Sequence, residues 1–278
     1  MKIRIQIYTI FFASVFLFSC KKESSAPAFN DIPVVQSYLQ AGSPASVSIS
    51  KLVAMDPNAQ YLPVNINALN VTITCNNISY PMSSTSSSSD SSYYINSSLI
   101  ISDSTNYTLQ FNYNGTAVTA FTNPPSKPKS CTQSATVISI AQRNAGGTVT
   151  TTTGLPALQP DPVTLTWANP DHSYYLVAVQ NVEANPELIN LADASQPARL
   201  FRSEPTQDIS SLVNPRQFHY YGTHKLTIYH ILPDYAALYK AQSNSSQNLT
   251  TSASSVTNGL GIFTGVNSTA LYINVTKQ

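Results

Sequence analysis

Apolar and polar side chains alternate along several short segments of this chain, and this alternation constrains the fold more than any other feature. From Tyr107 to Tyr113 every second residue is aromatic or aliphatic, and the residues between them are polar. A period of two is typical of a β-strand with one buried face. Asn114-Gly115 follows directly and is a common sequence of tight hairpin turns. We therefore expect antiparallel strands in this region.

The same period recurs along most of the chain, in segments 46–51, 69–74, 163–167 and 269–275. Only 10% of the residues are charged, and there are sixteen tyrosines. Helix bundles are rich in Lys and Glu, whereas tyrosine favours strands. The sequence therefore predicts an all-β protein.

A proline-rich stretch, Pro124-Pro125-Ser126-Lys127-Pro128, divides the pattern into two halves. Adjacent prolines are excluded from central strands and form stiff linkers. We predict an N-terminal Ig-like β-sandwich over 31–123, a linker over 124–132 and a C-terminal sandwich over 133–278.

The C-terminal half resembles fibronectin type III domains, because Trp167 is followed by a turn and then by a strand that begins at Tyr174. We expect this tryptophan to lie in the core. Short helical insertions are predicted in this half at 185–194, where Asn185-Pro186 has the pattern of a helix start, and at 234–241.

The first twenty residues have the pattern of a bacterial lipoprotein signal. A short basic segment precedes an apolar run that is shorter than the roughly 20 residues of a membrane-spanning helix. The run ends in Leu17-Phe18-Ser19-Cys20, which resembles the lipobox, whose cysteine is acylated. We predict a signal peptide over 1–19, acylation of Cys20 and a lipidated tether over 20–30. An ordinary signal peptide with an incidental cysteine is the alternative.

Acylation of Cys20 would anchor the protein to the membrane through its lipid chains. We expect the protein to lie at the outer membrane, where it could face either the periplasm or the cell surface. The whole chain has 14 basic and 13 acidic side chains. This balance argues against nucleic acid as a partner, because phosphate binding requires a basic surface.

Two further cysteines, Cys75 and Cys131, would remain in the exported protein. An exported pair can stay oxidised. A disulfide between them and two separate buried thiols are both compatible with the sequence, because spacing alone does not establish proximity.

The histidines and acids do not form a recognisable catalytic or metal-binding pattern. His224 and His230 would share one face of a strand but lie about 20 Å apart, too far to bind one metal. Asp171-His172-Ser173 contains the residue types of a catalytic triad, but neighbours in sequence rarely have triad geometry, so we expect a turn. We therefore predict no cofactor, no metal and no enzymatic activity.

A modification site is suggested at Ser104. Asp103-Ser104-Thr105 resembles the short motif for O-glycosylation of exported Bacteroidota proteins, in which Ser104 would be the acceptor. A chance occurrence of the tripeptide is the alternative.

Four segments carry a family resemblance: Ile32-Pro33-Val34-Val35 with Tyr38-Leu39, Phe201-Arg202-Ser203-Glu204-Pro205-Thr206, Tyr221-Gly222-Thr223-His224-Lys225, and Asn258-Gly259-Leu260-Gly261-Ile262-Phe263-Thr264-Gly265. They resemble a family of uncharacterised Bacteroidota lipoproteins, domain-of-unknown-function family 4249. Its members are often encoded beside TonB-dependent receptors. The resemblance implies an accessory role in uptake. The glycines of the last segment suggest a partly buried turn with close backbone approach.

The sequence thus favours a lipid-anchored envelope protein with a non-enzymatic binding or accessory role, with a TonB-dependent receptor or a glycan as its partner. An adhesin or surface-assembly module is the main alternative, and a hydrolase with scattered catalytic residues is a weaker one. We expect recognition through the loops at 185–196 and 243–258, because loops on a rigid scaffold commonly carry binding residues.

Overall fold

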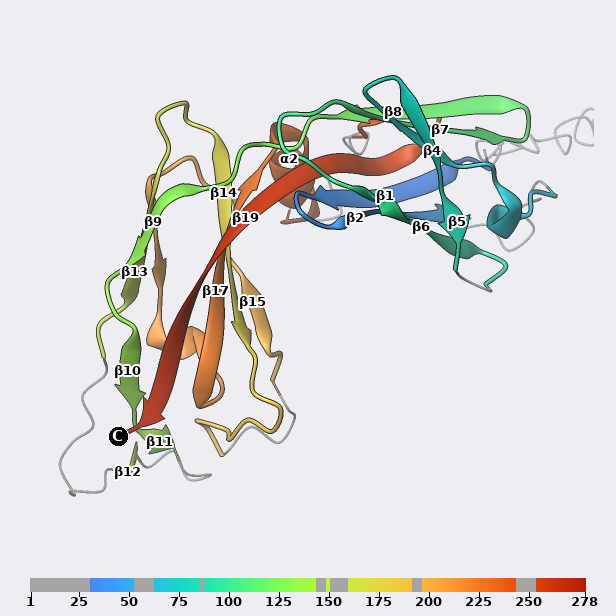
Figure 1. Ribbon diagram of the computed structural model, residues 1–278. Helices are drawn as coiled ribbons and strands as arrows, with labels where there is room; N and C mark the ends of the chain where they lie inside the picture. Colours follow the sequence, from blue (N-terminus) through green and yellow to red (C-terminus); the bar gives the residue numbers. More distant parts are fainter. Residues whose placement is uncertain are drawn as a thin grey trace, which may run out of the picture. The chain divides into compact units, whose positions relative to one another are not determined.

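The computed structural model describes residues 31–52, 63–85, 88–143, 149–150, 160–191, 197–243 and 254–278, which belong to one compact unit (Figure 1). The predicted signal peptide over 1–19 and the whole predicted tether over 20–30, with Cys20, lie outside the described residues. Within the described part, strands predominate and form two β-sandwiches, so the prediction of an all-β protein is confirmed.

The first sandwich pairs two sheets. One sheet contains β1 (Pro33–Gln40), β2 (Pro44–Lys51), β5 (Ser83–Ser84), β6 (Ser91–Ile100) and the first half of β19 (Leu260–Lys277). The other contains β3 (Thr72–Cys75), β4 (Ile78–Pro81), β7 (Tyr107–Tyr113), β8 (Thr116–Thr122) and β18 (Val256–Thr257). A short 3-10 helix, η2 (Ile66–Ala68), adjoins the sandwich.

The core of this sandwich follows the period-two pattern. On β7 the residues Tyr107, Leu109, Phe111 and Tyr113 are buried, and the residues between them are exposed. The hairpin turn between β7 and β8 is also confirmed, because Asn114 and the next glycine both have positive φ. That backbone geometry is required by the tight hairpin turn.

The second sandwich has a larger and a smaller sheet. The larger contains β10 (Val137–Ile140), β14 (Tyr174–Asn181), β15 (Leu200–Arg202), β17 (Gly222–Ile231) and the second half of β19. The smaller contains β9 (Lys129–Gln133), β13 (Val163–Ala168) and β16 (Ser210–Val213), and the short pair β11 (Gln142–Arg143) and β12 (Val149–Thr150) stands apart from both sheets. A 3-10 helix, η3 (Pro215–Gln217), follows β16.

Aromatic side chains fill the core of the second sandwich. Trp167 is buried on β13, and its ring centroid lies 5.3 Å from that of Tyr175 on β14. Tyr175 in turn stacks on His230 of β17, with ring centroids 4.6 Å apart. The predicted core position of the tryptophan is therefore confirmed.

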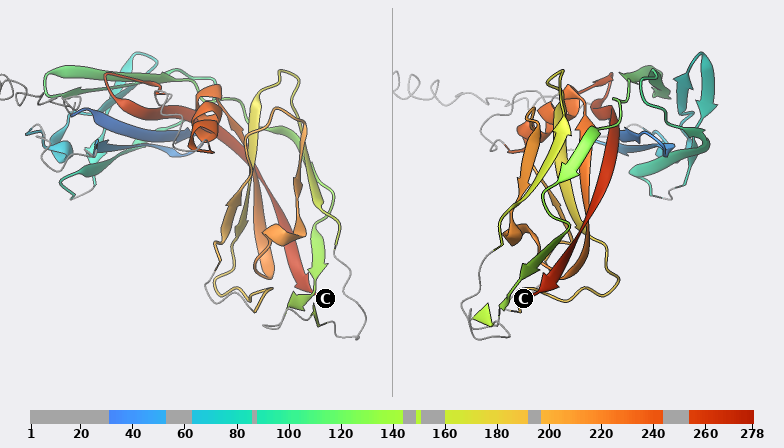
Figure 2. Two further views of the ribbon diagram at one scale, coloured as in Figure 1. Left: turned by 180° about the vertical axis from the view of Figure 1, so that it is seen from behind. Right: turned by 60° about the vertical axis from the view of Figure 1, so that its left-hand side comes forward.

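The last strand, β19, belongs to both sandwiches (Figures 1 and 2). Its first half pairs in parallel with β1, beginning at Val34 opposite Leu260, and its second half pairs with β17 as far as Val275. Residues 256–265 thus belong to the first sandwich, where Val256 and Phe263 are buried in the core. The predicted C-terminal domain over 133–278 is wrong in this respect, because the first sandwich needs the end of the chain to complete both of its sheets.

The segment predicted as a linker is fastened to the strands that it passes. Its first part, 124–128, has no regular structure, whereas 129–133 forms β9, so the predicted linker over 124–132 is too long. The hydroxyl of Thr269 donates to the Pro128 carbonyl, and the amide of Asn267 donates to that of Pro125. His230 donates from Nδ1 to the Ser126 carbonyl at 2.8 Å. These bonds hold the segment against β17 and β19.

Of the two predicted helical insertions, one is present. The helix α2 (Pro233–Ser243) contains the predicted helix at 234–241. The insertion predicted at 185–194 is not helical where it is described: Leu188 forms an isolated bridge with Tyr220, and Ile189 donates a backbone hydrogen bond to His219. Tertiary pairing thus overrides the helix-start signal. In the described residues, no helix has the length and apolar character needed to span a bilayer.

Candidate functional site

In the described part of the chain, the large sheets of the two sandwiches form one continuous nine-stranded sheet through β19. One face of this shared sheet carries a groove lined by tyrosines. Alternation on β1 directs Val35 and Leu39 into the core of the first sandwich and places Gln36, Tyr38 and Gln40 on the opposite face. The same alternation on β14 sends Val177 to the core of the second sandwich and leaves its neighbours on the groove side. The groove therefore lies where the sheet continues from one sandwich into the other.

The groove has a volume of about 360 Å³. Its lining combines aromatic, amide, guanidinium and aliphatic groups from six elements: Gln36, Tyr38, Gln40, Leu176, Arg202, Tyr229, Tyr235 and Val266. A concave site with an apolar floor and a few polar groups is the usual form of a ligand pocket.

Pairing across the sheet brings these residues together. Tyr229 on β17 lies directly opposite Leu176 on β14, and Val266 on β19 lies opposite Gln40 on β1. Arg202 is the last residue of the edge strand β15 and is exposed. Residues far apart in sequence thus form one continuous surface.

Helix α2 supplies one side of the groove. The ring of Tyr235 lies 5.1 Å, between centroids, from the ring of Tyr38. Burial raises the pKa of the Tyr235 phenol, nearby Tyr38 raises it further, and Arg202 acts in the opposite direction. The phenol therefore stays protonated at neutral pH and can both donate and accept a hydrogen bond.

The first turn of α2 is fixed to β19 by Asp234. Its Oδ1 atom accepts hydrogen bonds from the hydroxyl of Thr264 and from the backbone N–H of Tyr235, each at 2.8 Å. The Thr264 side chain is fully buried. This contact sets the position of Tyr235 over the sheet.

The chain can be assigned to a protein family. The model of the domain of unknown function DUF4249 matches residues 22–271. The chain belongs to this family. The part of the resemblance that concerns the family itself is therefore confirmed.

Other comparisons add little for this DUF4249 protein. No curated protein matches it. Solved structures of titin domains align over most of the chain. Domains A168–A170 match at 10% identity over 89% of this chain and 68% of that chain, with a TM-score of 0.22. The Ig tandem domains A164–A165 match at 8% identity over 89% of this chain and 97% of that chain, with a TM-score of 0.20. These TM-scores are too low to support any conclusion about function.

The four segments that carry the family resemblance border the groove or lead into it. The first contributes Tyr38, the second contributes Arg202, and the fourth ends at Gly265, immediately before Val266. The third begins β17, which contributes Tyr229 and continues into α2. The sequence alone does not connect these segments, because their proximity depends on pairing between distant strands.

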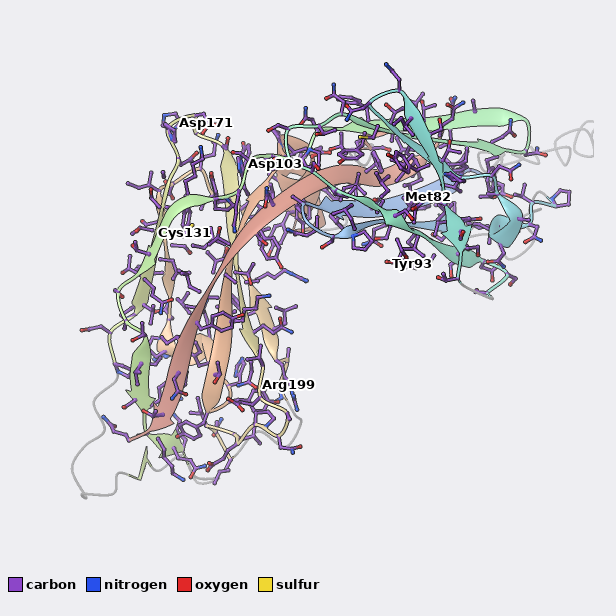
Figure 3. The ribbon with its side chains drawn as sticks, viewed as in Figure 1. Met82, Tyr93, Asp103, Cys131, Asp171 and Arg199 are labelled. Atoms are coloured by element: carbon purple, nitrogen blue, oxygen red, sulfur yellow. The ribbon has the colours of Figure 1, made fainter. Side chains whose placement is uncertain are left out.

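Ser104 lies in an exposed turn with φ of +55°. Its backbone N–H donates to the Pro124 carbonyl at 2.8 Å, while its neighbour Asp103 approaches the amide of Asn267 (Figure 3). The site is accessible to a modifying enzyme, and its glycosylation stays a prediction.

The disulfide that the sequence allowed between Cys75 and Cys131 is not formed. Both are free thiols. Cys75 is buried in the core of the first sandwich, whereas Cys131 packs against the core of the second. Burial raises the pKa of the Cys131 thiol. Of the two alternatives, separate thiols agree with the structure, because each cysteine belongs to a different core.

The histidines of β17 have structural partners. His224 is buried, donates from Nδ1 to the Gly222 carbonyl and contacts the Asn181 amide, and burial lowers its pKa. His230 is also buried. The described residues contain no group of three or more His, Cys, Asp or Glu side chains that could hold a metal.

Asp171-His172-Ser173 forms a turn, as predicted, in which Ser173 donates to the Asp171 carboxylate and His172 has positive φ (Figure 3). The loops expected to carry recognition are described only in part: residues 192–196 and 244–253 lie outside the described residues.

Proposed function

We propose that this protein is a lipid-anchored component of the bacterial outer membrane with a non-enzymatic binding role, and that it assists a TonB-dependent receptor in uptake. The lipobox-like segment ending at Cys20 supports the anchor. The family resemblance supports the link to uptake.

The observation that carries the binding role is the tyrosine-lined groove. Tyr38, Tyr229 and Tyr235 present large amphipathic side chains with few rotatable bonds, which gives contact area at low entropic cost. At the groove, Tyr229 pairs with both β14 and β19, and Val266 pairs with both β1 and β17, so the floor is rigid. A rigid aromatic floor favours recognition of a ligand.

The chemistry of the lining favours binding over catalysis. Its one charged group is the guanidinium of Arg202, which does not exchange protons near neutral pH. The nearby carboxylate of Asp234 is engaged by Thr264 and by the start of α2. The lining residues that the structure describes thus have hydrogen-bonding groups but no carboxylate, imidazole or thiol to serve as a general base.

Photo-crosslinking in native envelopes tests this proposal. A photoreactive amino acid at Gln36, which is exposed at the groove, should capture a TonB-dependent receptor or its bound cargo. The same label at Tyr93, an exposed residue on β6, is the matched control and should capture neither (Figure 3). Cys20→Ala should abolish acylation, release the protein from the membrane fraction and eliminate capture. Capture from Tyr93 alone, or membrane attachment with an unmodified Cys20, would contradict the proposal.

A further inference from the structure

The groove combines flat aromatic rings with neutral amides and one cation, and this combination defines a class of ligand. We propose that it binds an acidic saccharide, with a sugar ring packed on the tyrosines and a carboxylate bound by Arg202. This inference rests on the proposed binding role of the groove and names what occupies it.

The aromatic part of the lining suits the C–H face of a sugar ring. Tyr38 and Tyr235 are in contact, and both pack with Tyr229 against a small apolar cluster that includes Leu176 and Val266. Tyrosine offers an apolar ring face together with a hydroxyl that hydrogen-bonds at the rim. A pyranose has the same division, with apolar C–H groups on its faces and hydroxyls around its edge.

The amides complement those hydroxyls. Gln36 and Gln40 each carry a donor and an acceptor at the tip of the side chain, and a sugar hydroxyl can serve as either partner. The Gln40 amide reaches the Ser268 hydroxyl at 3.3 Å and the Ala41 carbonyl at 3.4 Å, both at the long end of hydrogen-bond distances. A ligand hydroxyl can therefore compete for this amide.

Charge distinguishes an acidic sugar from a neutral one. The guanidinium of Arg202 is exposed, and the ion pair found among the described residues is the distant one between Lys277 and Glu187. Among the described residues, no acidic side chain lines the groove to neutralise it. Guanidinium binds carboxylates through paired, charge-assisted hydrogen bonds.

The backbone argues against an extended peptide as the occupant. Peptides that bind to sheets usually add a strand and pair with free backbone groups at an edge. At the groove, Tyr229 on β17 pairs with Leu176 and with Ser268, and Val266 on β19 pairs with Gln40 and with Ile231, so the backbone there is already paired on both sides. Recognition in this groove must therefore depend on side chains, as hydroxyl-rich ligands require.

The test is a glycan array probed with the full-length protein in detergent, followed by calorimetry with each saccharide that binds. The array carries uronic and sialic acid saccharides beside neutral ones of the same length, and a peptide with a free C-terminal carboxylate serves as competitor. We expect binding of acidic saccharides, about tenfold weaker binding of a carboxyl-reduced counterpart, and no competition by the peptide.

Matched variants locate the binding. Arg202→Gln should weaken affinity to the level of the neutral saccharide, and Tyr235→Ala should abolish binding, whereas Tyr235→Phe keeps the ring and should retain most of it. Arg199→Gln, beside the same strand, and Tyr93→Ala are controls and should bind normally (Figure 3). Unchanged thermal midpoints establish that the variants are folded.

Absence of acidic saccharide binding, equal binding of neutral saccharides, displacement by the peptide, or loss of binding in the control variants would each overturn the inference. If crosslinking from Gln36 still captures a partner in envelopes while the array shows no acidic saccharide, the ligand class is wrong and the binding role stands. If capture also fails, the proposed function fails with it.

Discussion

Backbone contact is unusually close where Gly261 of β19 passes Val35 of β1. Gly261 has φ of +100°, and a Cβ atom at this position would overlap the Val35 carbonyl oxygen. At Gly265, four residues further on, a Cβ atom would overlap the backbone of Pro124. Glycine at these two positions lets the last strand lie against both β1 and the proline-rich segment.

Replacing Gly261 should therefore destabilise the fold more than replacing a glycine in open space. Gly261→Ala combines backbone strain with overlap, whereas Gly42→Ala, at φ of +83° with no atom within 4 Å, has the strain alone. We expect Gly42→Ala to cost about 1–2 kcal/mol and Gly261→Ala distinctly more. Urea denaturation measures both. Equal losses would show that β1 and β19 are not in close contact.

Asp234 makes stability depend on pH. Burial raises its pKa above the ordinary value of 3.8, so the folded protein keeps a proton that the unfolded chain releases. The free energy of unfolding should fall as the pH rises from about 3.8 through the raised value, and stay lower above it. Asp234→Asn keeps the acceptor oxygen without the charge. Its free energy of unfolding, relative to that of the wild type, should therefore increase as the pH rises from 3 to 7.

Asp234→Ala is the complementary variant. It leaves the buried Thr264 hydroxyl and the Tyr235 N–H without their acceptor, which should cost about 1–3 kcal/mol at any pH. Denaturation curves at several pH values distinguish the two variants. A difference between wild type and Asp234→Asn that does not change with pH would refute the role of the charge.

At the scale of elements, local periodicity predicted strands such as β2, β3, β7 and β13 well because each buries one face. The buried positions of β7, its turn at Asn114, the core position of Trp167 and helix α2 were all readable from neighbouring residues. The insertion at 185–194 was not, because pairing of Leu188 with Tyr220 replaces the helix.

Neither the groove nor the sharing of β19 between the two sandwiches could be predicted from the sequence, and both have the same physical reason. β1 pairs with β19 across more than two hundred residues, and no local pattern records a parallel partner at that distance. Tyr38, Arg202 and Tyr235 had recognisable contexts, in two motif segments and a helix, but nothing in their spacing placed them side by side. The free cysteines follow the same rule, since only the fold shows that they belong to different cores.

The shared strand predicts that the two sandwiches unfold together. Leu109→Ala opens a cavity in the fully buried core of the first sandwich and should cost about 2.7–5 kcal/mol. Trp167 is the only tryptophan and lies in the second sandwich, so its fluorescence reports the other half. We expect its denaturation midpoint to fall by the same amount as the midpoint seen by circular dichroism. An unchanged fluorescence midpoint would show that the sandwiches unfold independently.

At the scale of the whole molecule, the protein combines a lipid anchor, expected at Cys20, with a sheet whose exposed face holds the groove. Two sandwiches connected by β19 and by the bonds to the proline-rich segment present one continuous surface rather than two separate modules. Arg202 of one sandwich and Tyr38 of the other both line the groove on this surface. Binding at this face requires that both sandwiches remain intact.

Hydroxyl-radical footprinting of the tyrosines tests most directly whether this groove is the binding surface in the cell. The wild-type protein is oxidised in intact envelopes and again after purification in detergent, and the modified peptides are quantified by mass spectrometry. We predict that Tyr38, Tyr229 and Tyr235 are protected in envelopes relative to the purified protein, while Tyr93 is oxidised equally in both. Equal oxidation of the groove tyrosines in both samples, with protection confined to other surfaces, would contradict the account.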